Sequence, residues 1–588
     1  MADPTYSYHT FIFPFIWQND IGREKGHNFN AIKRIFNNND AWGDDDLYDW
    51  QEVLLNERDI QPDGLNVNKL KYATYQYYQP AIREAVFGKK KKNDKYSSIF
   101  TSKTAASEKD IVQNFYFKPI KDENGHNKDA KYVIRKTIQV GKTVSKIMNY
   151  ELLLQDIKLR LYNTGVGLLV FICENKKTSD LDDIKRINDY GRRITLPFVP
   201  DKGGIMGSVC ADSITISWEG LSDFIEDNFR EQALRLNDAE IFAKYTHVAN
   251  FIKDILNYNS DIDGEAGTIF TASMTKGKKD KYWYIQPALD DRMFVMCAVN
   301  KNFQKLFRTG FSRFTPCEYI NSLKDGSLGN YKNRVFSCES MEKSLYEFIY
   351  CDPPGGCTCY FSPMRQQLIK EHLYCRWVAP EFGTLYTVAA QAFNCVSDYY
   401  LILNYFRTEY YEMVCLVLAQ RASLRVMQNE ASSLSIDIEK DDNDVDQERR
   451  KQIANLQEKL IAFQNQINLY EISSQEQAIE LYDMMRDAFL VNKHTSILQE
   501  QLDGLYNIAN IHQSNNISKW AILVSVSAML IAVPSFFGDS SVWPIDSLDN
   551  ILMDVEKDNE VSWSHTMFIT KMVALGIVVW LFFKFSKK

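Results

Sequence analysis

Two adjacent arginines follow a predicted helix, and their type and spacing suit the capture of an anion. The chain reads NDYGRR from Asn188 to Arg193, so two guanidinium groups stand directly after a glycine turn. Paired guanidinium groups bind phosphate or carboxylate oxygens through parallel N–H···O hydrogen bonds. The alternative is an ordinary ion pair at a helix end, which this pattern alone does not exclude. Arg192 and Arg193 are our leading candidates for binding a phosphate.

Three further residues are weaker candidates for the same ligand. Arg292 opens a predicted strand, and Arg376 and Trp377 precede a loop. A tryptophan beside an arginine can stack on an adenine-like ring. The predicted ligand-binding residues are Arg192, Arg193, Arg292, Arg376 and Trp377.

The sequence contains no recognisable catalytic motif. It has no P-loop, no G-x-S-x-G and no H-E-x-x-H pattern, and its eight histidines show no metal-ligand spacing. Cys351, Cys357 and Cys359 form a C-x5-C-x-C cluster without the second pair expected of a zinc site, which favours reduced cysteines in core positions. We therefore predict a protein that binds a ligand and is not an enzyme, with any metal ligands unassigned.

Composition limits the class of protein. The 588 residues include 68 basic and 76 acidic side chains, a net charge of −8, and 45% are hydrophobic. That hydrophobic fraction is too high for a disordered chain, and a mean hydropathy of −0.33 excludes a protein that crosses a membrane many times. A basic footprint over the whole chain is absent, so direct binding of nucleic acid is not predicted.

The first 400 residues contain the elements that must position the arginines. β-Branched and aromatic residues predict strands at 132–140, 165–173, 213–218, 292–299 and 344–351. Helical patterns follow several of these strands, including LDDIKRINDY after the capping residues Ser179 and Asp180. The predicted fold class of this part is α+β, a mixed sheet with helices.

A helical stalk is predicted to follow this domain. Apolar residues recur in steps of three and four from Ile453 to Ile467 and again from Leu498 to Ile508. An acidic stretch beginning at Asp437 separates an earlier helix, 399–433, from one long helix that continues into an apolar segment. Two or three ordinary helices in a bundle are the alternative.

Two apolar stretches near the C-terminus predict membrane-spanning helices. The stretch 520–537 has no charged residue, and the stretch 563–583 contains only Lys571. At 1.5 Å per residue the first measures about 27 Å, close to the thickness of the hydrocarbon core. Lysines flank the pair and acidic residues fill the loop between them, so a hairpin with both chain ends in the cytoplasm is predicted. The predicted organisation is 1–400 ligand-sensing domain, 401–518 helical stalk, 519–538 first span, 539–562 external loop, 563–584 second span and 585–588 basic tail.

Small residues form a stripe along the first predicted span. Such a stripe suits either close helix packing or the lining of a narrow pore, and both interpretations stay open. The acidic loop would concentrate cations at the outer mouth of a pore. The candidate pore-lining residues are Ser518, Ser525, Ala528, Ala532 and Ser535, and the candidate ion-attracting residues are Asp539, Asp546 and Asp549.

This layout resembles the CorA-type divalent-cation transporter family. Members of that family are homo-oligomers, usually pentamers, whose first span lines the pore. Their Gly-Met-Asn motif is matched here by FGDS, from Phe537 to Ser540, in which only the glycine is retained. The resemblance therefore implies the architecture and the oligomer but leaves magnesium selectivity in doubt.

Three segments, LYNTGVGLLVFICEN, DIKRINDYGRR and RWVAPEFGTLYTVAAQAFN, resemble a CorA-like subgroup that accompanies type III CRISPR systems. This resemblance implies a bacterial inner-membrane effector of antiviral defence, gated by a nucleotide second messenger such as S-adenosylmethionine–AMP. The implied partners are a lipid bilayer, the nucleotide and further copies of the chain, with no covalent cofactor. The alternatives are a constitutive magnesium transporter, which would bind a divalent cation, and a membrane-anchored coiled-coil assembly without conduction.

Overall fold

The computed structural model describes most of the chain up to Phe536. The described residues are 4–21, 24–26, 41–44, 73–87, 111–122, 125–140, 144–194, 210–221, 224–231, 248–256, 269–272, 281–290, 292–307, 316–324, 339–374, 383–436 and 443–536.

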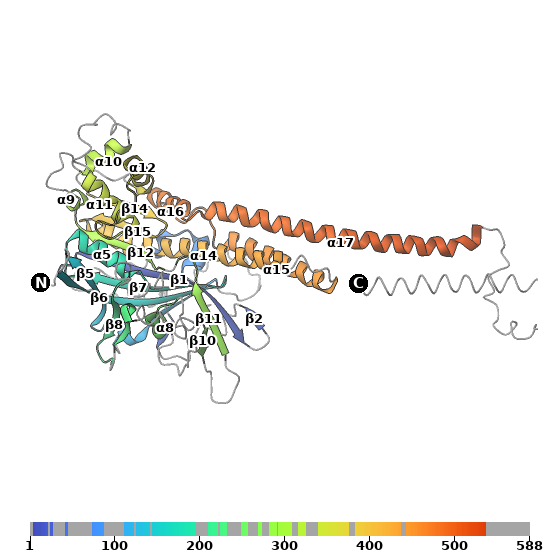
Figure 1. The fold of residues 1–588 in the computed structure, drawn as a ribbon, viewed down its shortest axis with the longest axis horizontal. Coiled ribbons are helices and arrows are strands. Elements are labelled where there is room, and N and C mark those ends of the chain that lie inside the picture. The colour runs from blue at the N-terminus through green and yellow to red at the C-terminus, as the bar shows by residue number, and fades with distance from the viewer. Residues whose placement is uncertain are drawn as a thin grey trace, which may run out of the picture. The chain divides into compact units, whose positions relative to one another are not determined.

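A mixed sheet of 15 strands forms the centre of the described structure (Figure 1). Its main path runs β13-β14-β15-β12-β1-β7-β6-β5-β8-β9, and only the pair β12–β15 is parallel. The strands are β1 (Ser7–Ile21), β2 (Glu24–Gly26), β3 (Trp42–Asp44), β4 (Val112–Phe117), β5 (Ala130–Val140), β6 (Val144–Tyr162), β7 (Val166–Asn175), β8 (Ser213–Trp218), β9 (Ile225–Asp227), β10 (Ile269–Ala272), β11 (Lys281–Pro287), β12 (Phe294–Asn300), β13 (Leu373–Tyr374), β14 (Leu385–Ala389) and β15 (Ala392–Ser397).

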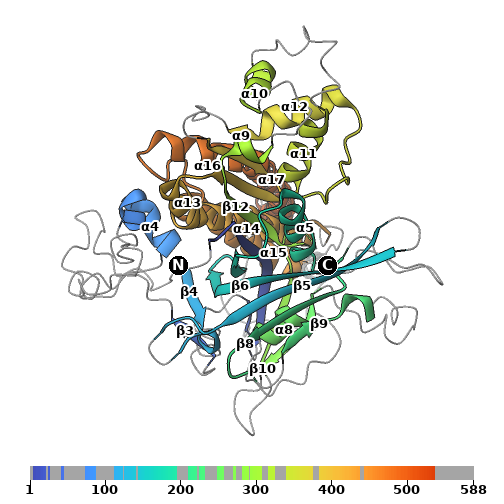
Figure 2. The ribbon, with the colours of Figure 1, turned by 90° about the vertical axis from the view of Figure 1, so that its left-hand side faces the viewer.

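Helices cover both faces of this sheet. Figures 1 and 2 show α5, α9, α10, α11 and α12 on one side and α8 on the other. The helices are α4 (Pro80–Phe87), the 3-10 helix η1 (Lys118–Ile120), α5 (Leu181–Gly191), α8 (Asn250–Leu256), α9 (Phe303–Leu306), α10 (Pro316–Lys324), α11 (Glu339–Tyr350), α12 (Ser362–His372), α13 (Tyr400–Arg407), α14 (Glu409–Ile436), α15 (Asn443–Gln466), α16 (Glu476–Ala488) and α17 (Val491–Phe536).

The long strand β1 is the spine of the sheet. One of its edges pairs with β7, and the other pairs first with β12, up to Ile12, and then with β11, from Phe15 onward. Pro14 lies in the gap between those two partners, where the missing N–H of a proline breaks no ladder hydrogen bond on that edge. The sequence analysis did not assign this strand.

Helix α5 packs against β1 and β5. It begins where the Asp180 carboxylate accepts hydrogen bonds from the backbone N–H groups of Asp182 and Asp183, as an N-cap should. It ends at Gly191, where an added Cβ atom would lie only 2.5 Å from Cζ of Phe11 on β1. A glycine is therefore needed for the close approach that places Arg192 and Arg193 at the sheet.

The mixed sheet with helices is present as predicted, and four of the five predicted strands are confirmed as β5, β7, β8 and β12. The fifth prediction is wrong, because 344–351 belongs to helix α11 and its final turn. A short apolar run fits a buried strand and a buried helix equally well in sequence. Its apolar residues face the core at helical spacing, with Met341, Leu345, Phe348 and Ile349 all buried.

The prediction of one continuous stalk helix is also wrong. The predicted helix 399–433 is divided at Thr408 into α13 and α14, and the stretch after Asn443 forms α15, α16 and α17. Leu490 has a φ of 53°, a left-handed conformation that ends one helix before α17 begins.

The chain divides into two compact units, which we describe separately. The first contains 1–428 and 459–496, and the second contains 429–458 and 497–588. In the second unit the apolar positions predicted to face a partner helix are buried, namely Ile453 and Leu456 on α15 and Leu498, Leu502 and Leu505 on α17.

The transmembrane hairpin of the predicted fold class is wrong. None of the helices that the structure describes is both long and apolar enough to cross a membrane. Residues 520–536 of the first apolar stretch lie on helix α17. The second stretch, 563–583, lies outside the described residues. The membrane and channel assignments and the inner-membrane location are corrected accordingly.

Candidate functional site

The C-terminal end of α5 holds a cluster of cationic side chains centred on Arg192. The Arg192 side chain is only 2% exposed. Its Nη2 donates a hydrogen bond to the carbonyl oxygen of Cys351 at 3.3 Å and lies 3.9 Å from Oδ1 of Asp189. Its Nε and Nη1 are buried and have no hydrogen-bond partner among the described residues. A buried, charged group with unsatisfied donors is rare and needs an explanation, such as a bound ligand or ion.

Arg193 and Arg292 meet beside Arg192. The two residues form an isolated antiparallel bridge between the end of α5 and the start of β12, and the backbone N–H of Met293 donates to the Arg192 carbonyl at 2.7 Å. The structure thus joins two arginine clusters that lie about 100 residues apart in sequence. Each of these arginines has a carboxylate partner: Arg193 contacts Asp189 at 2.8 Å, and Arg292 contacts Asp290 at 2.8 Å. Ion pairing accounts for Arg193 and Arg292, but it does not account for the free donors of Arg192.

Burial sets the electrostatics of the cluster. It lowers the pKa of Arg192, and the neighbouring Arg292 and Arg193 lower it further against the opposing effects of Cys351 and Asp189. Burial raises the pKa of Asp189, and Arg193 and Arg192 oppose that shift. Both groups are therefore held in an environment that disfavours their charge. An incoming anion would stabilise the arginine and complete its hydrogen bonds.

Lys136 is a member of the cluster that the sequence analysis missed. It lies on β5, where its buried Nζ donates to the carbonyl oxygen of Cys210 and stands 5.1 Å from the centre of the Tyr190 ring. Burial lowers its pKa, opposed by Asp212, Cys210 and Asp189. A pattern did point to it: Ala130, Tyr132 and Ile134 are buried at period two, which places residue 136 on the same face.

The thiol of Cys351, a residue in contact with the cluster, is not an activated nucleophile. Cys351 is buried, and burial raises the pKa of its thiol to about 11. It is therefore protonated at neutral pH and is a poor nucleophile.

A second array, from α5 to β1, has the outline of a catalytic triad. Ser7 Oγ lies 2.8 Å from Nε2 of His9, and Nδ1 of His9 lies 2.8 Å from Oδ1 of Asn188. All three side chains are buried, and Nδ2 of Asn175 donates to Ser7 Oγ at 2.9 Å. A nucleophile needs access to its substrate, which this serine lacks. These hydrogen bonds are structural, and this joint, as we call the buried Ser7–His9–Asn188 array, fixes α5 against the sheet.

This joint predicts a pH dependence of stability. Burial lowers the pKa of His9 to about 4, against an ordinary value of 6.5. The unfolded chain then binds more protons than the folded one between these values, so the free energy of unfolding falls as the pH drops from 6.5 to 4, by up to about 3 kcal/mol. Urea unfolding measured across this range includes this contribution, and His9→Gln should remove it and so change the slope. His126→Gln, at a side chain that is 78% exposed, should leave the slope intact. An unchanged slope in His9→Gln would contradict the assignment.

The remaining predicted site residues are not brought to the cluster. Arg376 and Trp377 lie outside the described residues, as do Asp539, Asp546 and Asp549. The residues predicted to line a pore, Ser518, Ser525, Ala528, Ala532 and Ser535, all lie on α17. Of their side chains only that of Ser525 is described, and its Oγ donates to the Ala521 carbonyl at 2.7 Å. The pore role presupposed the membrane hairpin, and we do not propose it.

The cysteine cluster offers no metal site in the described part of the chain. No group of three or more His, Cys, Asp or Glu side chains there could hold a metal ion. Cys351, Cys357 and Cys359 are free thiols, and the Sγ atoms of Cys357 and Cys359 donate to backbone carbonyls.

Comparison of the chain with family models, with curated proteins and with solved structures finds no match. The resemblance to CorA-type proteins therefore stays a prediction. What the described residues show is a cluster of arginines on an α+β scaffold, with the buried guanidinium of Arg192 at its centre.

Proposed function

We propose that this protein is a ligand-gated effector whose sheet domain binds a phosphate-bearing nucleotide messenger at the arginine cluster Arg192, Arg193 and Arg292. The observation that carries the proposal is the buried guanidinium of Arg192, with Nε and Nη1 unsatisfied. Charge-assisted hydrogen bonds to a phosphate would satisfy those donors. Arg193 and Arg292, whose side chains are 15% and 35% exposed, supply the accessible rim.

Binding at this cluster has a physical route to the rest of the sheet domain. Helix α5 is joined to α11 by the buried ion pair of Lys185 with Glu347 at 2.8 Å and by the contact of Arg192 with the Cys351 carbonyl. Helix α11 in turn contacts β14 and β15, which contact α16 and α13. A ligand that shifts the Arg192 side chain therefore changes its contact with the residue that follows α11. These contiguous contacts support an energetic coupling between the arginine cluster and α13 and α16, which a measured coupling energy would establish.

The messenger class follows from the sequence resemblance, and S-adenosylmethionine–AMP is the first ligand to test. Homo-oligomerisation through the helical stalk stays a prediction. We propose that the chain acts by binding and not by catalysis.

Calorimetric titration of the full chain tests this function. We expect one site for AMP, ATP or S-adenosylmethionine–AMP, with inorganic phosphate binding more weakly and adenosine not binding. In Arg193→Gln/Arg292→Gln the affinity should fall at least about tenfold, because each hydrogen bond to a charged group contributes about 1.5–3 kcal/mol.

Arg186→Gln is the matched control, since Arg186 lies on the same helix with its own carboxylate partner, Asp183, at 3.0 Å. Its affinity should equal that of the wild type. Absence of binding by every nucleotide, or equal affinity in the double variant and the wild type, would overturn the proposal.

A further inference from the structure

Strand β6 has an edge with no partner strand in the described structure. Strand β5 pairs with its first half, from Val144 to Leu153, and β7 pairs on the opposite edge only from Leu153 onward. The β6–β7 register shifts at Leu154/Asp156, close to the point where that pairing begins. On the β7 edge, the backbone N–H and C=O groups of 144–152 pair with no strand among the described residues. Such an edge is a template for another strand.

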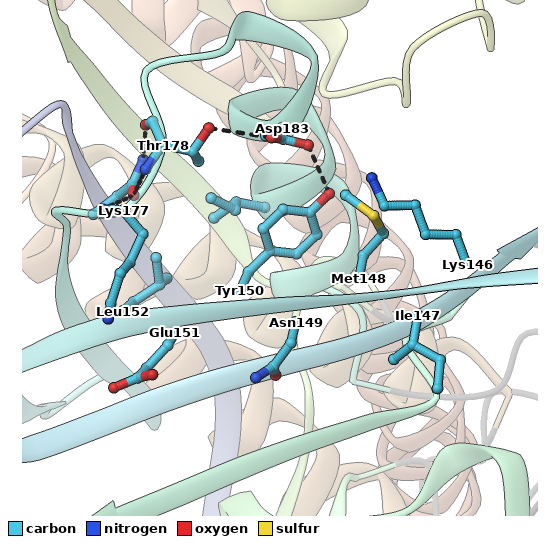
Figure 3. Close-up of a pocket in the computed structure, with 12 residues that line it drawn as sticks. Lys146, Ile147, Met148, Asn149, Tyr150, Glu151, Leu152, Lys177, Thr178 and Asp183 are labelled. Atoms are coloured by element: carbon cyan, nitrogen blue, oxygen red, sulfur yellow. Dashed lines mark hydrogen bonds between the residues drawn. The ribbon is translucent and has the colours of Figure 1, made fainter.

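A groove runs along this edge, and we call it the β6 groove. Seven consecutive residues of β6, 146–152, form one wall, and the end of β7 and helix α5 form the other (Figure 3). The residues of that second wall are Asn175, Lys177, Thr178, Asp183 and Ile187.

The dimensions of the β6 groove suit a peptide strand. Its volume is about 240 Å³. Sites for small molecules usually measure about 300–1,000 Å³, so the groove is small for such a ligand. Seven residues of strand extend for about 23 Å, at about 3.3 Å per residue. A groove lined by seven consecutive strand residues, beside an edge that pairs with no strand of the described residues, fits an extended backbone with one anchoring side chain.

The apolar side chains of the β6 groove favour a ligand with one apolar side chain. Figure 3 shows the side chains of Lys146, Met148 and Tyr150 rising from β6 on the side of α5. Tyr150 donates from its hydroxyl to Oδ1 of Asp183 at 3.0 Å, so its ring is fixed in place. Met148 is half-buried and Ile187 is buried, which gives the groove an apolar floor.

The charged side chains around the β6 groove favour a peptide with acidic residues on either side of its apolar residue. The two carboxylates beside it are already paired, Asp183 with Arg186 at 3.0 Å and Glu151 with Lys131 at 2.9 Å. Lys146 and Lys177 are exposed. Lys131 and, more weakly, Lys177 help to lower the pKa of Glu151, so the charge of Lys177 also acts on that carboxylate. Around the groove the cations Lys131, Lys146, Lys177 and Arg186 outnumber the carboxylates Glu151 and Asp183, so the net charge of these groups is positive.

We propose that the β6 groove binds an extended peptide segment of a partner protein, which adds a strand to β6. The segment carries an apolar residue over Met148 and Ile187 and acidic residues that reach Lys146 and Lys177. This proposal does not depend on the arginine cluster. The competing explanation is that the exposed lysine protects the edge from pairing, as charged residues do on many edge strands.

Two fluorescent heptapeptides test the proposal by anisotropy with the full chain: Glu-Thr-Val-Leu-Val-Thr-Glu and the same sequence with lysine at both ends. We expect the acidic peptide to bind more tightly. In Lys146→Glu/Lys177→Glu the affinity for the acidic peptide should fall about tenfold or more and the preference should reverse. Lys118→Glu, at an exposed lysine of η1 outside the groove, should change neither affinity.

Backbone methylation separates strand addition from charge attraction. In an added strand only alternate amides face β6, so N-methylation of one alternate set should abolish binding and N-methylation of the other set should not. Equal effects of both sets, no binding of either peptide, or unchanged preference in the double variant would overturn the proposal.

Discussion

Replacing Arg192 by methionine is expected to stabilise the ligand-free protein and to remove nucleotide binding. The substitution keeps much of the apolar volume and removes two buried donor nitrogens, Nε and Nη1, that have no hydrogen-bond partner among the described residues. An unsatisfied buried polar group costs about 1–3 kcal/mol, so the free energy of unfolding should rise by up to that amount. Urea unfolding and calorimetric titration of Arg192→Met measure the two effects.

Arg365 provides the matched control for this experiment. It is equally buried, but its guanidinium donates to Oε1 of Glu342 and to the Cys359 carbonyl, both at 2.7 Å. Arg365→Met should therefore destabilise the protein and leave nucleotide binding unchanged. A loss of stability in Arg192→Met as large as that in Arg365→Met would show that Arg192 is a structural residue. A gain of stability with loss of binding is the pattern expected where a residue is kept for ligand binding although it destabilises the fold.

The second large effect is expected at the buried ion pair of Arg160 with Glu412. The pair joins β6 to α14 through two hydrogen bonds of 2.5 and 2.7 Å, and both side chains are almost fully buried. Arg160→Met alone leaves the Glu412 carboxylate buried without its partner, which should reduce the free energy of unfolding by about 3–5 kcal/mol. Urea denaturation measures the loss.

A double-mutant cycle tests whether the loss comes from the orphaned charge. Arg160→Met/Glu412→Leu removes both charges and should recover most of the stability, because apolar replacements of a buried ion pair are often neutral. Additive losses in the double variant would contradict this explanation. They would instead indicate that packing around Arg160, including its position 5.0 Å from the Tyr411 ring centre, supplies the stability.

Local pattern was sufficient for several elements of the sheet domain. Ser213–Trp218 matches its predicted strand at both ends, because alternating β-branched and aromatic residues at a half-buried position favour one conformation. Helix α5 and its N-cap at Asp180 were equally readable, since capping is a contact between neighbours in sequence. The arginine pair after α5 could be found for the same reason.

Local sequence patterns could not predict which residues meet at the arginine cluster. Arg292 reaches Arg193 only because β12 and α5 meet at the sheet, and Lys136 joins them from β5. The unsatisfied donors of Arg192 are a property of everything that surrounds the side chain, so no local pattern encodes them. The β6 groove likewise depends on where β7 stops pairing, which is a property of two strands together.

The apolar stretches show the limit of hydropathy. The stretch 520–537 has the composition of a membrane span, but none of the helices in the described part of the chain is long and apolar enough to cross a membrane. The stretch 344–351 has the composition of a strand and forms a helix against β14 and β15. By itself, then, the sequence determined the sheet domain, the position of α5 and the arginines at its end, because these follow from contacts within a few residues. The tertiary structure decided which charges meet, which stay unsatisfied and which edge stays open, because those depend on segments that only folding brings together.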